Sequence, residues 1–104
     1  IPLRFHFLNE DSPDFLLVAE NGWFITDRDN YKKIGNTLNG MHGYDPKHMS
    51  THGIFYAMGP SFREGYEIKS FENIHIYPLI CSILNISEYK NIDGDLNQVK
   101  GMLR

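Results

Sequence analysis

Residues 74–86 have the sequence IHIYPLICSILNI, in which apolar side chains recur at helical spacing. The apolar positions that would share one face are Ile76, Leu79, Ile80, Ile83 and Leu84. This spacing predicts an amphipathic helix, and it makes Cys81 a core residue rather than a nucleophile. Pro78 is compatible with a helix that begins near His75, because amides of the first turn have no partner within the helix.

Apolar runs of strand length lie upstream of this helix. Residues 15–19 and 54–58 are continuous apolar runs, the type that is buried on both faces of a sheet. An Asn-Gly pair at 21–22 favours a hairpin turn that leads into residues 23–27, which have high β propensity. Residues 1–7 alternate apolar and polar side chains and therefore predict a short strand.

The remaining segments complete the expected fold. Residues 27–52 are rich in Gly, Asn and Asp and show almost no periodicity, and a connection this long is usually functional or disordered. Residues 96–103 predict a short last helix. The order of strand, long loop, strand, loop and helix indicates an α/β fold with short strands and one main helix near 74–86. We expect residues 1–104 to form a single segment of a domain.

Composition and charge narrow the class of protein. The chain has 104 residues, enough for one core, and its 41% hydrophobic and 13% aromatic content is typical of a globular protein. A net charge of -3 with scattered basic residues argues against general nucleic-acid binding, and no apolar run could span a membrane. The single Cys81 excludes an internal disulfide framework. The chain begins at Ile1 without a methionine or a leader, so we expect either a processed chain or a piece of a longer chain, and we favour the second.

His42 lies on a glycine-rich stretch, Gly40-Met41-His42-Gly43, inside the long loop. Glycine allows positive φ and lets a backbone come close to a ligand, so the imidazole could reach into a site. This setting is typical of a metal-binding or acid/base histidine on a loop held by strands. The alternative is a surface-loop histidine without a task.

The other histidines have weaker signals. His52 precedes an apolar run and is a candidate second ligand. A cluster of His52 with Asp45 and His48 would need helical spacing, which Pro46 disfavours. The simpler interpretation is that His48 and His52 are polar residues leading into a strand. His75 is expected at the start of the last long helix.

A complete catalytic set is missing from the sequence. The chain contains neither a G-x-S-x-G nucleophile elbow nor a phosphate-binding G-x-x-x-x-G-K-S/T loop. The Ser50-Thr51 pair beside His52 lacks an orienting third member. We therefore assign no catalytic residue. A single candidate metal ligand, His42, without partner ligands is what one part of a larger metal site would contain.

Several blocks of the sequence occur in an order that belongs to a known family. They are GMHGYD at 40–45, STHGIF at 50–55, MGPSFREG at 58–65 and FENIHIYPLIC at 71–81. Together they resemble the last conserved part of the nucleotide pyrophosphatase/phosphodiesterase family, in the alkaline phosphatase superfamily. The resemblance covers nearly the whole chain and about the last quarter of a typical catalytic domain.

The resemblance implies the C-terminal fragment of an alkaline-phosphatase-like, three-layer α/β/α core that holds two zinc ions. It implies that His42, in an H-G-F/Y-D motif, is a zinc ligand, while a Thr or Ser nucleophile and the other ligands lie upstream. Asp45 is then either a second-sphere residue that orients a ligand or a support of the turn. The sequence departs from the family at Pro46, where Asn is usual, and at Thr51, where Met is common.

By this resemblance, the intact domain hydrolyses phosphodiester or pyrophosphate bonds of nucleotides through a phospho-enzyme, and the isolated chain is expected to be inactive. The alternatives are a phosphodiesterase acting on lipid head groups and a non-catalytic α/β interaction module. The partners implied are the phosphodiester substrate and the remainder of the catalytic domain. An isolated copy would expose sheet edges, so we expect it to dimerise. The family also implies an extracytoplasmic location, either secreted, periplasmic or outward-facing.

Overall fold

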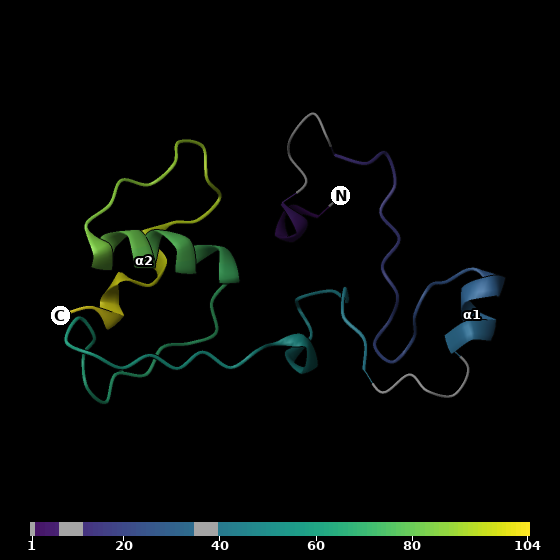
Figure 1. Ribbon diagram of the computed structural model, residues 1–104, viewed down its shortest axis with the longest axis horizontal. Coiled ribbons are helices and arrows are strands. Elements are labelled where there is room, and N and C mark those ends of the chain that lie inside the picture. Colours follow the sequence, from purple (N-terminus) through teal and green to yellow (C-terminus); the bar gives the residue numbers. More distant parts are fainter. Residues whose placement is uncertain (1, 7–11, 35–39) are drawn as a thin grey trace. The chain divides into compact units, whose positions relative to one another are not determined.

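The chain consists of two compact units, residues 1–53 and residues 54–104. The computed structural model describes residues 2–6, 12–34 and 40–104. Figure 1 shows the α-helix of each unit, α1 (Arg28–Ile34) in the first and α2 (Ile76–Leu84) in the second. Within the described residues no strand forms, and no helix is long and apolar enough to cross a membrane.

Helix α1 begins after an aspartate that caps its first turn. The Asp27 carboxylate accepts hydrogen bonds from the backbone N–H groups of Asp29 and Asn30, both at 2.9 Å. These bonds, the one from Asn30 most of all, lower the pKa of Asp27 from its ordinary value. Such a cap satisfies N–H groups that have no partner within the helix. The prediction of an irregular loop over 27–52 is therefore wrong at the residues of α1.

The turn at 21–22 forms as predicted, but the segments on either side of it do not pair as strands. The Trp23 N–H donates to the Glu20 carbonyl at 2.9 Å and closes the turn. Residues 15–19 were expected in a buried strand, yet Phe15 is 88% exposed. Without a neighbouring strand, the backbone has no ladder partner and the side chains have no apolar face to cover them.

Two further strand predictions are wrong within the described residues. In the first unit, Leu3–Phe5 form a 3₁₀ turn where residues 1–7 predict a strand, although both ends of that stretch lie outside the described residues. In the second unit, residues 54–58 form no strand and Ile54 is fully exposed. A sheet becomes stable only with three or more strands or a covering helix. The three-layer α/β/α core therefore stays a prediction about the whole domain.

The helix predicted near 74–86 is confirmed in the second unit. A 3₁₀ turn at Asn73–His75 runs into α2, so Pro78 lies in the first turn, where a missing N–H is tolerated. Asn85 ends the helix with a φ of 53°, and the Ile86 N–H returns to a carbonyl of the last turn at 3.0 Å. A left-handed residue followed by such a bond is a common helix ending.

The core of the second unit is small and includes one face of α2. Leu79 on α2 packs with Val99 and Met102, and all three side chains are at most 5% exposed. Partly buried apolar residues surround them, among them Phe62. Cys81, at 2% exposure, is buried as predicted. Burial of these side chains is the main apolar contribution to the stability of the unit.

The C-terminal end of the chain completes this unit. Residues 96–103, expected as a short helix, instead form two 3₁₀ turns, Leu96–Gln98 and Lys100–Met102, which lie beside α2 in yellow in Figure 1. The Arg104 N–H then donates to the Ser61 carbonyl at 3.0 Å. This bond joins residue 104 to a segment that lies about fifteen residues before the start of α2 in the sequence.

Gly94 lies so close to the start of α2 that no side chain fits there. A Cβ atom would overlap the Ile74 carbonyl oxygen and lie 3.0 Å from Cδ of Pro78. Because the backbone must shift to relieve this overlap, we expect Gly94→Ala to destabilise the second unit by about 1–3 kcal/mol. Amide hydrogen exchange of residues 73–103, in the full-length protein that contains this chain, measures the change.

Gly101→Ala is the matched control for this substitution. Its Cβ would come within 2.6 Å of the Tyr66 hydroxyl, the far end of a side chain that is 44% exposed and can turn away. We therefore expect a loss below about 1 kcal/mol. Equal losses for the two variants would contradict the explanation by backbone overlap.

Candidate functional site

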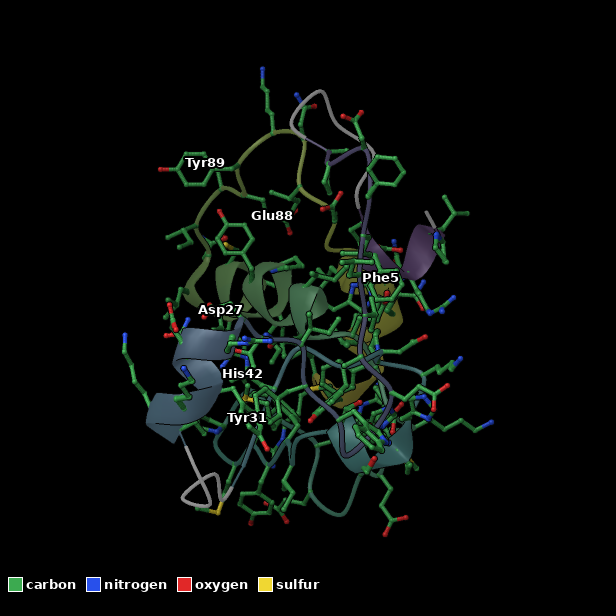
Figure 2. All side chains as sticks on the ribbon, turned by 90° about the vertical axis from the view of Figure 1, so that its right-hand side faces the viewer. Phe5, Asp27, Tyr31, His42, Glu88 and Tyr89 are labelled. Atoms are coloured by element: carbon green, nitrogen blue, oxygen red, sulfur yellow. The ribbon has the colours of Figure 1, made fainter. Side chains whose placement is uncertain are left out.

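His42, labelled in Figure 2, is exposed on a loop of the first unit. Residues of three chain segments, 21–22, 40–46 and 50–51, contribute to the lining of an open depression of about 790 Å³ that includes His42. The Asn21 side chain donates to the Ser50 hydroxyl at 2.7 Å and joins two of these segments. Gly43 takes a φ of +88°, the conformational freedom that its place beside His42 predicts.

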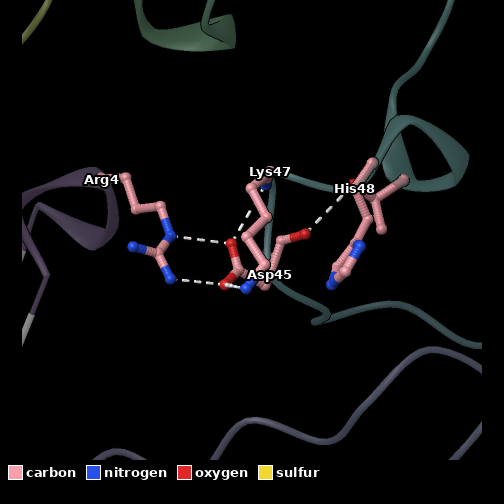
Figure 3. Close-up of polar contacts among 5 residues, drawn as sticks. Arg4, Asp45, Lys47 and His48 are labelled. Carbon is pink, nitrogen blue, oxygen red and sulfur yellow. Dashed lines mark hydrogen bonds and ion pairs between the residues drawn. The ribbon is translucent and has the colours of Figure 1, made fainter.

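Asp45, three residues after His42, is 8% exposed and its carboxylate is bound through both oxygens. The Arg4 guanidinium donates from Nε to Oδ1 at 2.8 Å and from Nη2 to Oδ2 at 2.5 Å, the paired bonds drawn in Figure 3. Oδ1 also accepts the Lys47 N–H at 3.0 Å, and the Lys47 ammonium lies 3.4 Å from Oδ2. Through these contacts, Asp45 supports the turn that includes Lys47.

The same contacts set the charge of Asp45. The hydrogen bonds from the Arg4 side chain are the largest cause that holds the pKa of the Asp45 carboxyl well below its usual range. The Lys47 N–H and the positive charges of Arg4 and Lys47 act in the same direction, and they outweigh the opposing effect of burial. Asp45 is therefore an anion at neutral pH.

His48 and His52 belong to the turn that follows Asp45. The His48 N–H donates to the Asp45 carbonyl at 3.2 Å, and the Thr51 hydroxyl donates to the His48 carbonyl at 2.6 Å. His52 Nε2 lies 3.0 Å from the Pro46 carbonyl oxygen. Because a carbonyl can only accept, this nitrogen carries the hydrogen and has no lone pair to offer a metal ion. The contacts make both histidines polar residues of a turn, while the strand into which they were expected to lead does not form among the described residues.

The described residues do not bring a full set of metal ligands together. No group of three or more His, Cys, Asp or Glu comes together among them to hold an ion. His42 offers an imidazole, a ligand that zinc prefers, on an open loop with room for an ion. Asp45 is committed to Arg4 and the turn. The chain thus fits one corner of a metal site whose other ligands would come from elsewhere.

Two polar contacts of the structure have no signal in the sequence. Arg4 and Asp45 are 41 residues apart, and the alternation of residues 1–7 places Arg4 merely on a polar face. In the second unit, His75 lies at the start of α2, as expected. Its side chain is also buried, and its Nδ1 accepts the Asp95 N–H at 3.0 Å. Both contacts join distant parts of the chain within one unit.

The lowered pKa of Asp45 predicts a pH dependence of its turn. An acid whose pKa is lowered by folding stabilises the fold above its ordinary value, here 3.8, and this contribution is lost as the pH falls through the folded value. We expect exchange protection of residues 43–48 to be constant between about pH 5 and 7 and to fall below about pH 4.

Asp45→Asn tests the cause of this pH dependence. The variant should already have lost protection of residues 43–48 at neutral pH, and it should show no further step below pH 4 from this site. Hydrogen exchange, corrected for the intrinsic rate at each pH, compares the two proteins. The same pH course in both would contradict the role of Asp45.

Comparison with known proteins shows which proteins this chain is similar to. No protein-family profile matches the chain, and no solved structure matches it. The chain is 36% identical over 104 residues to bis(5'-adenosyl)-triphosphatase enpp4 of Xenopus laevis, and the matched region covers 99% of this chain and 22% of the relative. It is 39% identical over 103 residues to ectonucleotide pyrophosphatase/phosphodiesterase family member 7 of Homo sapiens, covering 98% of this chain and 21% of the relative.

A venom enzyme shows the same similarity. The venom phosphodiesterase of Naja atra is 36% identical over 102 residues, covering 95% of this chain and 12% of the relative. The chain spans about a fifth of the length of the first two relatives, so it corresponds to a part of these hydrolases. Identity at this level along nearly the whole chain confirms the family that the sequence blocks indicate: this chain belongs to the nucleotide pyrophosphatase/phosphodiesterase family.

Proposed function

We propose that this chain is part of the catalytic domain of a metal-dependent phosphodiesterase that hydrolyses phosphodiester or pyrophosphate bonds of nucleotides. The observation that carries the proposal is the similarity, along nearly the whole chain, to three hydrolases. One of them, the Xenopus laevis relative, is named as a bis(5'-adenosyl)-triphosphatase, and this name supports a nucleotide substrate. A phosphodiesterase that acts on lipid head groups stays the alternative.

In this proposal His42 is a ligand of one of two zinc ions. Its support is local: the side chain is exposed, it lines an open depression, and Gly43 beside it takes a positive φ. When bound, such a pair of ions would stabilise the negative charge that develops in a phosphoryl displacement, and His42 would help to hold one of them. The nucleophile that forms the phospho-enzyme, and the other ligands, would come from parts of the domain outside this chain.

The residues around His42 have a structural task in this scheme. Asp45 closes its turn by accepting the Lys47 N–H, and Asn21 holds Ser50 at the other wall of the depression. They keep the loop in one conformation, so that the His42 imidazole is presented to its site at little cost in entropy. This chain would therefore supply one ligand and one wall, but no nucleophile.

The remainder of the catalytic domain is the partner that we propose for the exposed apolar side chains. The most exposed of them among the described residues, each at least 78% exposed, are Phe15, Leu17, Ile54, Tyr56, Met58 and Tyr89. Such faces are unfavourable in water and mark interaction surfaces. Strands elsewhere in a three-layer α/β/α core would cover them, and an isolated copy of the chain would dimerise instead. A non-catalytic interaction module, the alternative, would use the same faces for another protein.

The same proposal places the intact protein outside the cytoplasm. The human relative is named as an ectonucleotide enzyme and the Naja atra relative as a venom enzyme, and both names describe proteins that act outside the cell. Fractionation of cells that express the full-length protein would show whether it is exported.

The isolated 104-residue chain should not hydrolyse a nitrophenyl phosphodiester, with or without added zinc. The physical reason is that the nucleophile and most metal ligands lie elsewhere in the proposed domain. Release of nitrophenolate by the purified chain is measured beside the full-length protein. Turnover by the isolated chain would show that it contains a nucleophile of its own, and the proposal would fail.

In the full-length protein, His42→Ala should lower kcat/KM by more than about 100-fold, since even partners that only orient a metal ligand are worth 10–100-fold. Zinc content, measured by elemental analysis, should fall with it. His48→Ala is the matched control, because His48 holds its turn through the backbone and not through its ring. Equal zinc content and activity in the two variants would reject His42 as a ligand.

A further inference from the structure

We propose that Arg4 is a positioning residue for the His42 loop, and that it acts through its paired hydrogen bonds to Asp45. Neither the sequence blocks nor the relatives' names assign a role to Arg4. The proposal rests on the proposed function of His42 as a metal ligand. It adds that the conformation of this ligand's loop is decided by a residue 38 positions earlier in the chain.

The first step of the argument is the geometry of the pair. Nε and Nη2 of Arg4 each donate to a different oxygen of Asp45, at 2.8 Å and 2.5 Å (Figure 3). A guanidinium that binds both oxygens fixes the plane of the carboxylate as well as its position. A single charge would fix only the distance. The Asp45 side chain, at 11% exposure, is therefore held in one orientation.

The second step is the route from Asp45 to His42. Asp45 also accepts the Lys47 N–H, so the carboxylate that Arg4 orients is the one that closes the turn. Only Gly43 and Tyr44 separate this turn from His42. Gly43, at a φ of +88°, has wide conformational freedom and cannot by itself direct the imidazole. A fixed point just beyond the glycine limits that freedom, and Arg4 supplies it.

The third step explains why arginine is needed. Lys47 already places a positive charge 3.4 Å from Oδ2 of Asp45. The Lys47 side chain, which is 59% exposed, can therefore balance the negative charge of Asp45 without Arg4. What Arg4 adds is the planar fork with two donors, which lysine lacks. Loss of the fork, with the charge kept, is the change that separates positioning from simple charge pairing.

Arg4 is itself held in place by its own segment. It lies in the 3₁₀ turn Leu3–Phe5, and its guanidinium carbon is 4.9 Å from the centre of the Phe5 ring. Contact with an aromatic face limits the rotamers of a long cationic side chain. The fork is thus presented to Asp45 by a short turn of the first unit and not by a freely moving chain end.

The test uses the full-length protein and the variant Arg4→Lys, with Lys47→Gln as the comparison at the same carboxylate. A further control, Arg104→Lys, alters an exposed arginine that pairs with Glu64 in the second unit. Zinc affinity is measured by chelator competition, the metal geometry by the absorption spectrum after cobalt substitution, and kcat and KM with a nitrophenyl phosphodiester. Thermal unfolding of the metal-free proteins reports stability separately.

We expect Arg4→Lys to weaken zinc binding by about 10–100-fold, the range found for residues that orient a metal ligand, and to change the cobalt spectrum, because the loop that presents the His42 imidazole loses its fixed point. Lys47→Gln should change zinc affinity by less than about 3-fold, since it leaves the fork intact. Arg104→Lys should not change it. Lower thermal stability of metal-free Arg4→Lys, with unchanged zinc affinity and spectrum, would reduce Arg4 to a structural residue and overturn the proposal.

Two further variants keep the outcome clear. If Arg4→Lys does not fold, Asp45→Asn removes the acceptor charge from the other side of the pair and should weaken zinc binding to the same degree. If His42→Ala binds zinc as tightly as the parent protein, the proposed function of His42 fails. Exchange protection of residues 41–47 then tests the loop alone: unchanged protection in Arg4→Lys would overturn the positioning role as well.

Discussion

A carboxylate that leaves water must be paired, and Asp45 meets this requirement through Arg4. The pair joins the beginning of the first unit to the loop that contains His42, across 41 residues of sequence. The turn at Lys47 depends on the same carboxylate. In a unit without strands among its described residues, such polar contacts replace a sheet as the source of order.

The second unit is organised differently. It is built on the burial of Leu79, Val99 and Met102 between α2 and the C-terminal turns. Polar contacts support this packing where the chain crosses the start of α2, as in the bond from the Asp95 N–H to His75. A core of this size buries little apolar area. Exposed side chains such as Ile54 show how much apolar surface it leaves uncovered.

Local patterns in the sequence predicted the elements that depend on local physics. The apolar spacing and the tolerance of Pro78 in a first turn predicted α2 and its start. Its end, at Asn85 in the left-handed conformation, is a finding of the structure that falls within the predicted range. The cap of α1 also had a local signal, Asp27 followed by Asp29 and Asn30, which the low periodicity of the long loop concealed. The runs at 15–19 and 54–58 failed as strands, because a strand exists only with a partner and none is present among the described residues.

By itself, the sequence determined the position of α2, the turn at 21–22, the burial of Cys81 and the family, since each depends on residues close together in the chain or on their order. It also singled out His42 and Asp45, but it left open what Asp45 contacts. Only the tertiary structure decided that Arg4 binds Asp45 and that His75 receives the Asp95 N–H. The physical reason is that contacts between distant residues depend on the path of the whole chain, which no local spacing encodes.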